Sequence, residues 1–164
     1  MRIALLYLLL FSTSFLYSQN SANTSVRSTA VVVEPIEIEK NVDLHFGNVI
    51  SSFNPGRLIL SPDGNRTTFG VDISSANPGE VSAAEAIVTH GSYDYTVTLP
   101  ETFKLYNQNN PNQFLIIDEF TVSPETSAEN YDVLKIGATL NIQANQSGGL
   151  YTNNSGFTVT VTYN

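Results

Sequence analysis

Strict alternation of apolar and polar residues, repeated along most of the chain, is the feature that most limits its fold. The clearest run is 157–163, where Phe157, Val159, Val161 and Tyr163 alternate with three threonines. A period of two places successive side chains on opposite faces of a β-strand. This run therefore predicts a strand with one apolar face and one polar face.

Similar runs occur at residues 42–46, 66–73, 93–99 and 134–142, and turn-forming residues such as 61–65 separate them. One-sided strands at a spacing of roughly ten residues are typical of antiparallel sheets with one face on a core. Two such sheets stacked face to face bury both apolar sides. The sequence predicts an all-β fold, an antiparallel β-sandwich, in a single domain over residues 28–164. A short helix is considered only at 81–86.

The beginning of the sequence predicts export. Arg2 precedes an apolar stretch at 3–16, and Ser18 is a small residue before Gln19. This pattern is typical of a signal peptide, expected over residues 1–18, with a flexible polar leader at 19–27. The alternative is a retained anchor, but a spanning helix needs about 20 predominantly apolar residues. We expect secretion to the periplasm or outer cell surface, without membrane insertion after cleavage.

Charge and cysteine content exclude several function classes. The chain has 7 Lys and Arg against 15 Asp and Glu, a net charge of −8, and no cysteine. Nucleic acids and anionic lipids bind basic patches, so neither is expected as a partner. The lack of cysteine removes thiol catalysis and thiolate metal sites. Stability must come from apolar burial and backbone hydrogen bonds, without disulfides.

The first strand contains a change of face. Val31 and Val33 share one parity, whereas Ile36 and Ile38 share the other, and Pro35 lies between the two pairs. A proline lacks an N–H donor and is confined to strand edges or bulges. We therefore expect a sheet switch or bulge at Pro35.

The residues that enzymes use are not grouped in the sequence. His45 and His90 stand in no ligand or nucleophile motif and are interpreted as surface or strand-end histidines. Asp118 and Glu119 are consecutive, so as strand residues they are expected on opposite faces. No catalytic or cofactor-binding residue is assigned, and an enzyme is not expected.

Two weaker site hypotheses concern a turn and three tyrosines. Asp63 and Asn65 have the spacing of a calcium loop, but the same residues are good turn formers, so no metal site is assigned. Tyr106, Tyr131 and Tyr151 lie near predicted loops, where exposed aromatic rings could bind glycans. Ordinary packing is the favoured interpretation, since no evenly spaced aromatic row occurs.

Several segments together resemble a family of secreted bacterial proteins, domain of unknown function 4402. The segments that carry this resemblance are 33–36, 42–48, 60–64, 95–100, 136–140, 149–151 and 157–163. The family has no established activity, and the resemblance implies an exported β-rich domain.

The last run also looks like the final strand of chaperone–usher pilins and spore-coat-U-type proteins, although many pilins carry a disulfide. That likeness implies an immunoglobulin-like or pilin-like sandwich whose final strand pairs along its edge with a periplasmic chaperone or another copy. The face presented would be Phe157, Val159, Val161 and Tyr163. A strand that closes its own sandwich is the alternative.

The function expected from these patterns is structural or adhesive, at the cell surface, with a protein as the main partner. A monomeric carbohydrate- or protein-binding module is the alternative, which keeps glycan as a second partner.

Overall fold

The computed structural model describes residues 21–128 and 130–164. The predicted signal peptide, residues 1–18, lies outside these described residues. The chain divides into two units, residues 1–32 and residues 33–164. In the first unit, residues 21–32 have no regular secondary structure and their side chains are exposed.

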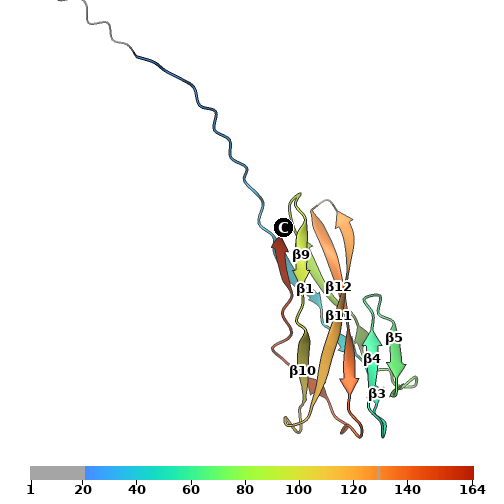
Figure 1. The fold of residues 1–164 in the computed structure, drawn as a ribbon. Coiled ribbons are helices and arrows are strands. Elements are labelled where there is room, and N and C mark those ends of the chain that lie inside the picture. The colour runs from blue at the N-terminus through green and yellow to red at the C-terminus, as the bar shows by residue number, and fades with distance from the viewer. Residues whose placement is uncertain (1–20, 129) are drawn as a thin grey trace, which may run out of the picture. The chain divides into compact units, whose positions relative to one another are not determined.

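Residues 33–128 and 130–164 form β-strands and no helix, which confirms the predicted all-β class (Figure 1). The strands are β1 (Glu37–Val42), β2 (His45–Phe46), β3 (Val49–Ile50), β4 (Gly56–Leu60), β5 (Arg66–Phe69), β6 (Asp72–Ile73), β7 (Val81–Ser82), β8 (Ala84–Thr89), β9 (Tyr95–Thr98), β10 (Thr102–Asn107), β11 (Phe114–Ala128), β12 (Tyr131–Ile142), β13 (Tyr151–Thr152) and β14 (Thr160–Tyr163). Among the described residues there is thus no helix long and apolar enough to cross a membrane. The helix considered at 81–86 was wrong: β7 and β8 occupy that stretch, and β8 is an inner strand because Ala84, Ala86 and Val88 alternate inward.

Every strand pair is antiparallel, as predicted; eight strands form a curled sheet, and the pairs β9–β14, β2–β7 and β3–β6 form separate two-stranded sheets. The order of the curled sheet is β1-β8-β12-β11-β10-β13. Strand β4 also pairs with β12, along Ala138–Ile142, whereas β8 pairs along Tyr131–Ile136. Two strands therefore lie end to end on one edge of β12, with Gly137 between them. A Cβ at Gly137 would overlap the carbonyl oxygen of Leu60, so only glycine permits this close approach.

A bulge in β11 accompanies the curl of the sheet. The register between β11 and β12 shifts between Asp118 and Thr121, and Glu119 has a positive φ of 46°. An extra residue in one strand bends that strand and increases its twist. The bulge lies beside the point where β12 passes from β8 to β4.

Strands β13 and β14 are two ends of one line of chain along β9 and β10. Thr152 pairs with Tyr106, and Thr160 pairs with Thr98. Thr152 and Thr160 are eight residues apart in the sequence, and so are their partners, Thr98 and Tyr106. The register is therefore the same at both ends. Continued through the gap, this register places Thr158 opposite Pro100. A proline cannot donate to a ladder, which explains why regular pairing resumes only at Thr160.

The core follows the predicted alternation of β12. Leu134, Ile136, Ala138, Leu140 and Ile142 are all buried, which confirms the face predicted for this run. Ala138, Leu140 and Ile142 belong to a large cluster with β4, and Leu134 belongs to a smaller one with β8. Tyr95, Val97 and Val161 pack on the smaller cluster, so β9 and β14 lie over β8 and β12.

Candidate functional site: the seam between the first and last strands

The curl of the sheet brings its two terminal strands to face each other. Strand β1 pairs only with β8, while β13 and β14 pair only with β10 and β9. Five antiparallel steps separate β1 from β13 in the strand order, so β1 and the last line of chain run in opposite directions. Figure 1 shows this for β1 and the red strand β14. We call the space between residues 34–52 and residues 145–163 the seam.

The upper part of the seam is an apolar groove. Its volume is about 230 Å³. One wall comes from β1 and the residues after it, the floor from β8 and β12, and the other wall from residues just before β14. The lining residues are Ile38, Lys40, Val42, Asp43, Leu44, Ala84, Glu85, Ala86, Ile136, Gly156, Phe157 and Val159. The small alanine side chains of the floor leave the space that forms the groove.

A second and larger groove continues the first toward the other end of the seam. Its volume is about 540 Å³, and both grooves share Leu44. Residues 44–49 and Ser51 form one wall, and residues 146–151 form the other. Leu105, Leu115, Leu140 and Ile142 form an apolar floor. The walls are more polar than those of the first groove, because His45, Glu80 and Gln146 contribute to them.

Hydrogen bonds close the seam at its two ends. At one end, the Tyr163 phenol donates to the Glu34 carbonyl (3.1 Å) and accepts from the Gly91 N–H (2.9 Å). At the other end, the Asn145 N–H donates to the Ser52 carbonyl (2.8 Å). Between these ends, no backbone hydrogen bond joins the two sides within the described chain. Both sides therefore keep free backbone groups over a hollow apolar floor.

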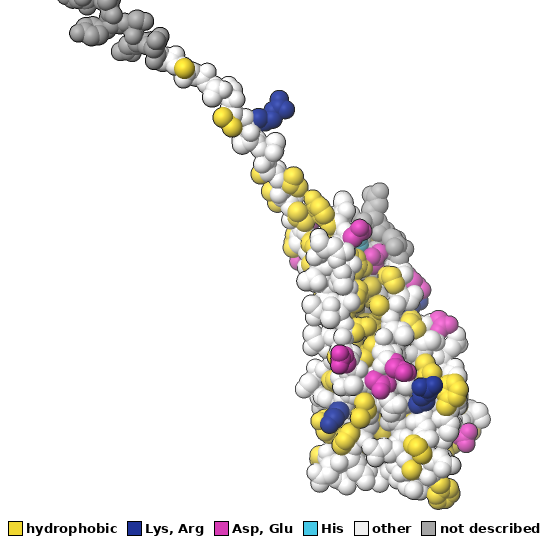
Figure 2. All heavy atoms as spheres, in the orientation of Figure 1, with side chains coloured by type: hydrophobic (Ala, Val, Ile, Leu, Met, Phe, Trp, Pro, Cys, Tyr) yellow, Lys and Arg dark blue, Asp and Glu magenta, His cyan; other side chains and the backbone are white. Residues whose placement is uncertain are grey.

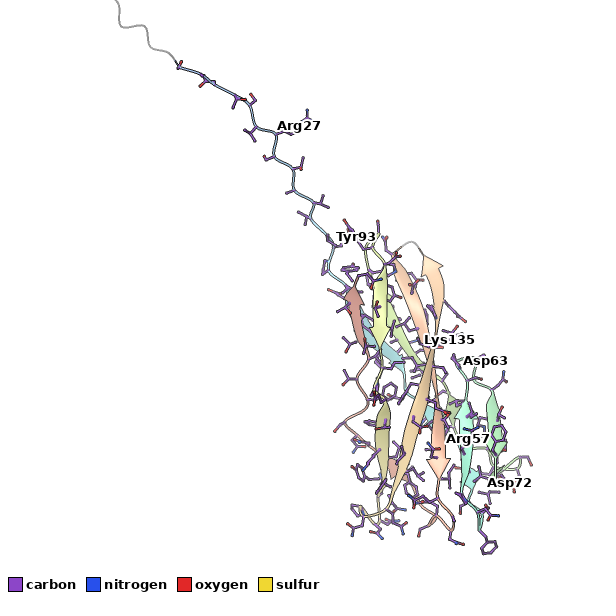
Figure 3. All side chains as sticks on the ribbon, in the orientation of Figure 1. Arg27, Arg57, Asp63, Asp72, Tyr93 and Lys135 are labelled. Carbon is purple, nitrogen blue, oxygen red and sulfur yellow. The ribbon has the colours of Figure 1, made fainter. Side chains whose placement is uncertain are left out.

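The four predicted edge residues share one face, and this face points inward. Phe157, Val159, Val161 and Tyr163 are half-buried, while the threonines between them are exposed. The Phe157 ring lies 5.0 Å from that of Phe120, measured between centroids. Tyr163 packs at 5.9 Å on Tyr93, which Figure 3 labels. Phe157 and Val159 also line the apolar groove, and the outer backbone edge of this segment is unpaired.

Pro35 stands before the first strand, because β1 begins at Glu37 and residues 31–36 have no regular structure. The register irregularity of this region lies within β1, between Lys40 and Val42. The preceding residue, Glu34, is the one that meets Tyr163. Pro35 therefore lies at the closed end of the seam, where the chain enters the sheet.

Comparison with protein families identifies the folded unit. Residues 36–163 match the family described as "Domain of unknown function (DUF4402)". The chain belongs to this family. The matched range includes both sides of the seam and leaves residues 21–35 outside. The comparisons with curated proteins and with solved structures gave no match.

The DUF4402 domain also holds a polar cluster that sequence reasoning missed. His90 directly follows β8, as expected of a strand-end histidine, but it is not a surface residue: its side chain is 15% exposed, and its Nε2 lies 3.3 Å from Asp132 Oδ2, without hydrogen-bond geometry. The Tyr95 phenol donates to the same oxygen (2.7 Å). Burial, and then this bond, raise the pKa of Tyr95 well above its ordinary value of 10.0. No sequence motif links these positions, since they come from the end of β8, from β9 and from β12.

The β11 bulge overturns a second expectation about the DUF4402 domain. Asp118 and Glu119 do not point to opposite faces, because the bulged backbone turns Glu119 back. Asp118 accepts from Asn141 (2.8 Å) and Glu119 from Thr139 (3.0 Å), and these two partners share one face of β12. Arg57, labelled in Figure 3, lies 3.9 Å from Glu119. The two carboxylates thus belong to a hydrogen-bonded surface that lines neither groove.

The remaining candidates lie away from the seam or apart from one another. In the 61–65 turn, Asp63 accepts from Ser61 and from Asn65 (2.5 Å), and these bonds, that of Ser61 foremost, lower the pKa of Asp63. Within the described chain, no three His, Asp or Glu side chains form a metal-binding group. Tyr106 and Tyr131 lie at opposite ends of β11, opposite Phe114 and Ala128. They cannot share one aromatic platform with Tyr151.

Proposed function

We propose that this DUF4402 protein is an exported, non-catalytic structural or adhesive subunit of a bacterial surface, which associates through strand pairing at the seam. The observation that carries the proposal is that β1 and the last line of chain face each other with unpaired outer edges. Unpaired N–H and C=O groups are templates for pairing with another chain. The apolar floor between the edges adds side-chain burial to backbone pairing.

Within this proposal the curled sheet is an immunoglobulin-like or pilin-like β-sandwich with an incomplete side. Strands β9 and β14 form part of one layer and β8 and β12 part of the other, and Val161 packs between them. The seam is the side on which the two layers are not joined by backbone pairing. A strand from a partner would complete it.

The sheet has a third free edge, along β5, which pairs only with β4. Phe69 on β5 is exposed, but Arg57 covers its ring at 5.0 Å. A charged side chain over an edge is one device that discourages pairing. Charged side chains also line the seam, at Lys40, Asp43 and Glu85, but its floor of Ala84, Ala86 and Ile136 is apolar and adds side-chain burial, so the seam is the favoured edge.

A non-catalytic role is supported by the position of a buried titratable cluster outside both grooves, whereas His45 and Glu80, which line the larger groove, have exposed side chains 3.8 Å apart. His90, Asp132 and Tyr95 line neither groove. Their contacts are with one another inside the domain, at distances that hold strands together.

The test compares two lysine substitutions by light scattering on residues 19–164. Ile38 lines the apolar groove and is 37% exposed; Ile73 on β6 is 36% exposed and lies outside it. We expect the unsubstituted chain to associate with increasing concentration, Ile38→Lys to remain monomeric, and Ile73→Lys to associate. A chain that stays monomeric at every concentration, or equal loss in both variants, would contradict the proposal.

A second candidate function, a monomeric carbohydrate- or protein-binding module, is favoured by the larger groove. Its Tyr151 hydroxyl takes part in bonds with Gln146 (2.7 Å) and the Ser147 carbonyl (2.7 Å), so polar groups are fixed beside an apolar floor. Such a combination suits a small ligand. Saturable binding of a soluble oligosaccharide to a monomer, weakened by Tyr151→Ala, would support it over self-association.

A further inference from the structure

The segment before the folded unit carries apolar side chains that are exposed in the described part of the chain. Val31 is 78% and Val32 is 94% exposed, and Val26 is also exposed. Residues 28–33 read Ser-Thr-Ala-Val-Val-Val, without a charge, and have no regular secondary structure. Figure 2 shows hydrophobic side chains along this segment, beside the single basic side chain of Arg27 that Figure 3 labels. Consecutive β-branched residues favour a strand, and exposed apolar runs mark contact sites.

We propose that residues 28–33 of one copy pair as a strand in the seam of a second copy, beside β1. This inference rests on the proposed function, and it names the partner that the seam accepts. The donated segment and β1 each have six residues, which span about 20 Å in a strand at ~3.3 Å per residue. The lengths therefore match over the whole of β1.

Backbone geometry provides partners on both sides of the inserted strand. The outer edge of β1 is unpaired, and on the facing side residues 157–159 make no backbone hydrogen bond within the described chain. Because β1 and β14 run in opposite directions, a strand between them is parallel to one and antiparallel to the other. Both ladder types are compatible with regular hydrogen bonding.

The side chains that line the groove also fit a donated strand with small, uncharged side chains. The groove floor is made by Ala84, Ala86 and Ile136, so space is left for side chains of intermediate size. Valine and alanine fill such space without introducing a polar group that would lack a partner. Alternate residues of the donor face this floor, so Val31 and Val32 cannot both point into it.

The test separates this inference from the proposed function by removing the donor. A chain of residues 33–164 keeps the whole second unit, and its folding is checked by circular dichroism and a melting curve. We expect it to stay monomeric where residues 19–164 associate, and to bind a synthetic peptide of residues 24–34 with a rise in melting temperature. If the shorter chain still associates, the donor is wrong while the proposed function stands. If residues 19–164 never associate, the proposed function fails too.

Point variants test the same inference without shortening the chain. Val31→Asp and Val32→Asp alter exposed side chains, so each is expected to keep the melting temperature of the monomer. One of the two should lower association at least tenfold, and the other should have a smaller effect, because adjacent strand residues face opposite sides. If residues 28–33 instead insert into the seam of their own chain, the protein is a monomer. One of the two variants would then lower its melting temperature at every protein concentration. That outcome would overturn the inference.

Discussion

The Tyr163 phenol lies 3.1 Å from the carbonyl oxygen of Glu34 and donates a hydrogen bond to it, tying the last strand to the residue before Pro35. The same hydroxyl accepts from the Gly91 N–H. One side chain thus closes one end of the seam. Its two bonds hold the facing edges at a fixed separation without pairing them.

Tyr163→Phe should destabilise the domain modestly and loosen this end of the seam. It removes two hydrogen bonds at about 1 kcal/mol each and leaves the N–H of the buried Gly91 without a partner. Urea unfolding should show a loss of about 1–3 kcal/mol. Tyr106→Phe is the matched control, since the Tyr106 ring is exposed and should change stability by less than about 0.5 kcal/mol. Equal effects of the two variants would contradict the role given to Tyr163.

Tyr95 should make the domain sensitive to alkaline pH. Folding raises the pKa of Tyr95, first through burial and then through Asp132, so the folded state favours the protonated phenol. The stability that this provides is complete below the unfolded pKa of about 10 and is lost as the pH rises above it. Tyr95→Phe should flatten the fall of the unfolding free energy above pH ~10. A fall of unchanged slope in this variant would show that other groups cause it.

Gly137→Ala should be strongly destabilising although it adds only one methyl group. The new Cβ would overlap the Leu60 carbonyl where β4 and β12 meet. Forcing an atom into a packed site costs typically about 1–3 kcal/mol. Gly148→Ala is the control, because nothing lies within 4 Å of its Cβ position. Thermal unfolding of both variants measures the difference, and a Gly137→Ala protein as stable as the control would contradict this close approach.

Residues 33–164 should carry the stability of the monomer, without a contribution from the segment before them. Leu134 is fully buried in the smaller core cluster, so Leu134→Ala should cost about 2–5 kcal/mol. Val32→Ala should change stability by less than about 0.5 kcal/mol, since the Val32 side chain is exposed. Denaturant unfolding at low protein concentration checks both. A large loss in Val32→Ala would mean that this side chain is covered within its own chain.

The alternation of apolar and polar residues predicted the strand faces correctly where one face of a strand is buried along its whole length. It identified the inward face of β12 and the shared face of Phe157, Val159, Val161 and Tyr163, because burial and alternation agree there. It failed at 81–86, where alanines and a glutamate are compatible with a helix and only pairing with β1 and β12 makes a strand.

Features that depend on contacts between residues distant in sequence could not be predicted from local sequence patterns. The bulge at Glu119 reverses the expected side of one carboxylate, and nothing in the local sequence signals it. His90 and Asp132 meet because β8 and β12 are neighbours. The seam itself requires the strand order, which places the first and last strands opposite each other.

Hydrogen exchange of the backbone amides, compared between dilute monomer and associated protein, tests the central claim most directly. At low concentration, the amides of residues 157–159 should exchange fast, because they donate no backbone hydrogen bond within the described chain. On association, these amides and the outward amides of β1 should become protected, while those of β5 remain unchanged. Association with protection at β5, and none at residues 157–159 or β1, would contradict the claim that the seam accepts the partner strand.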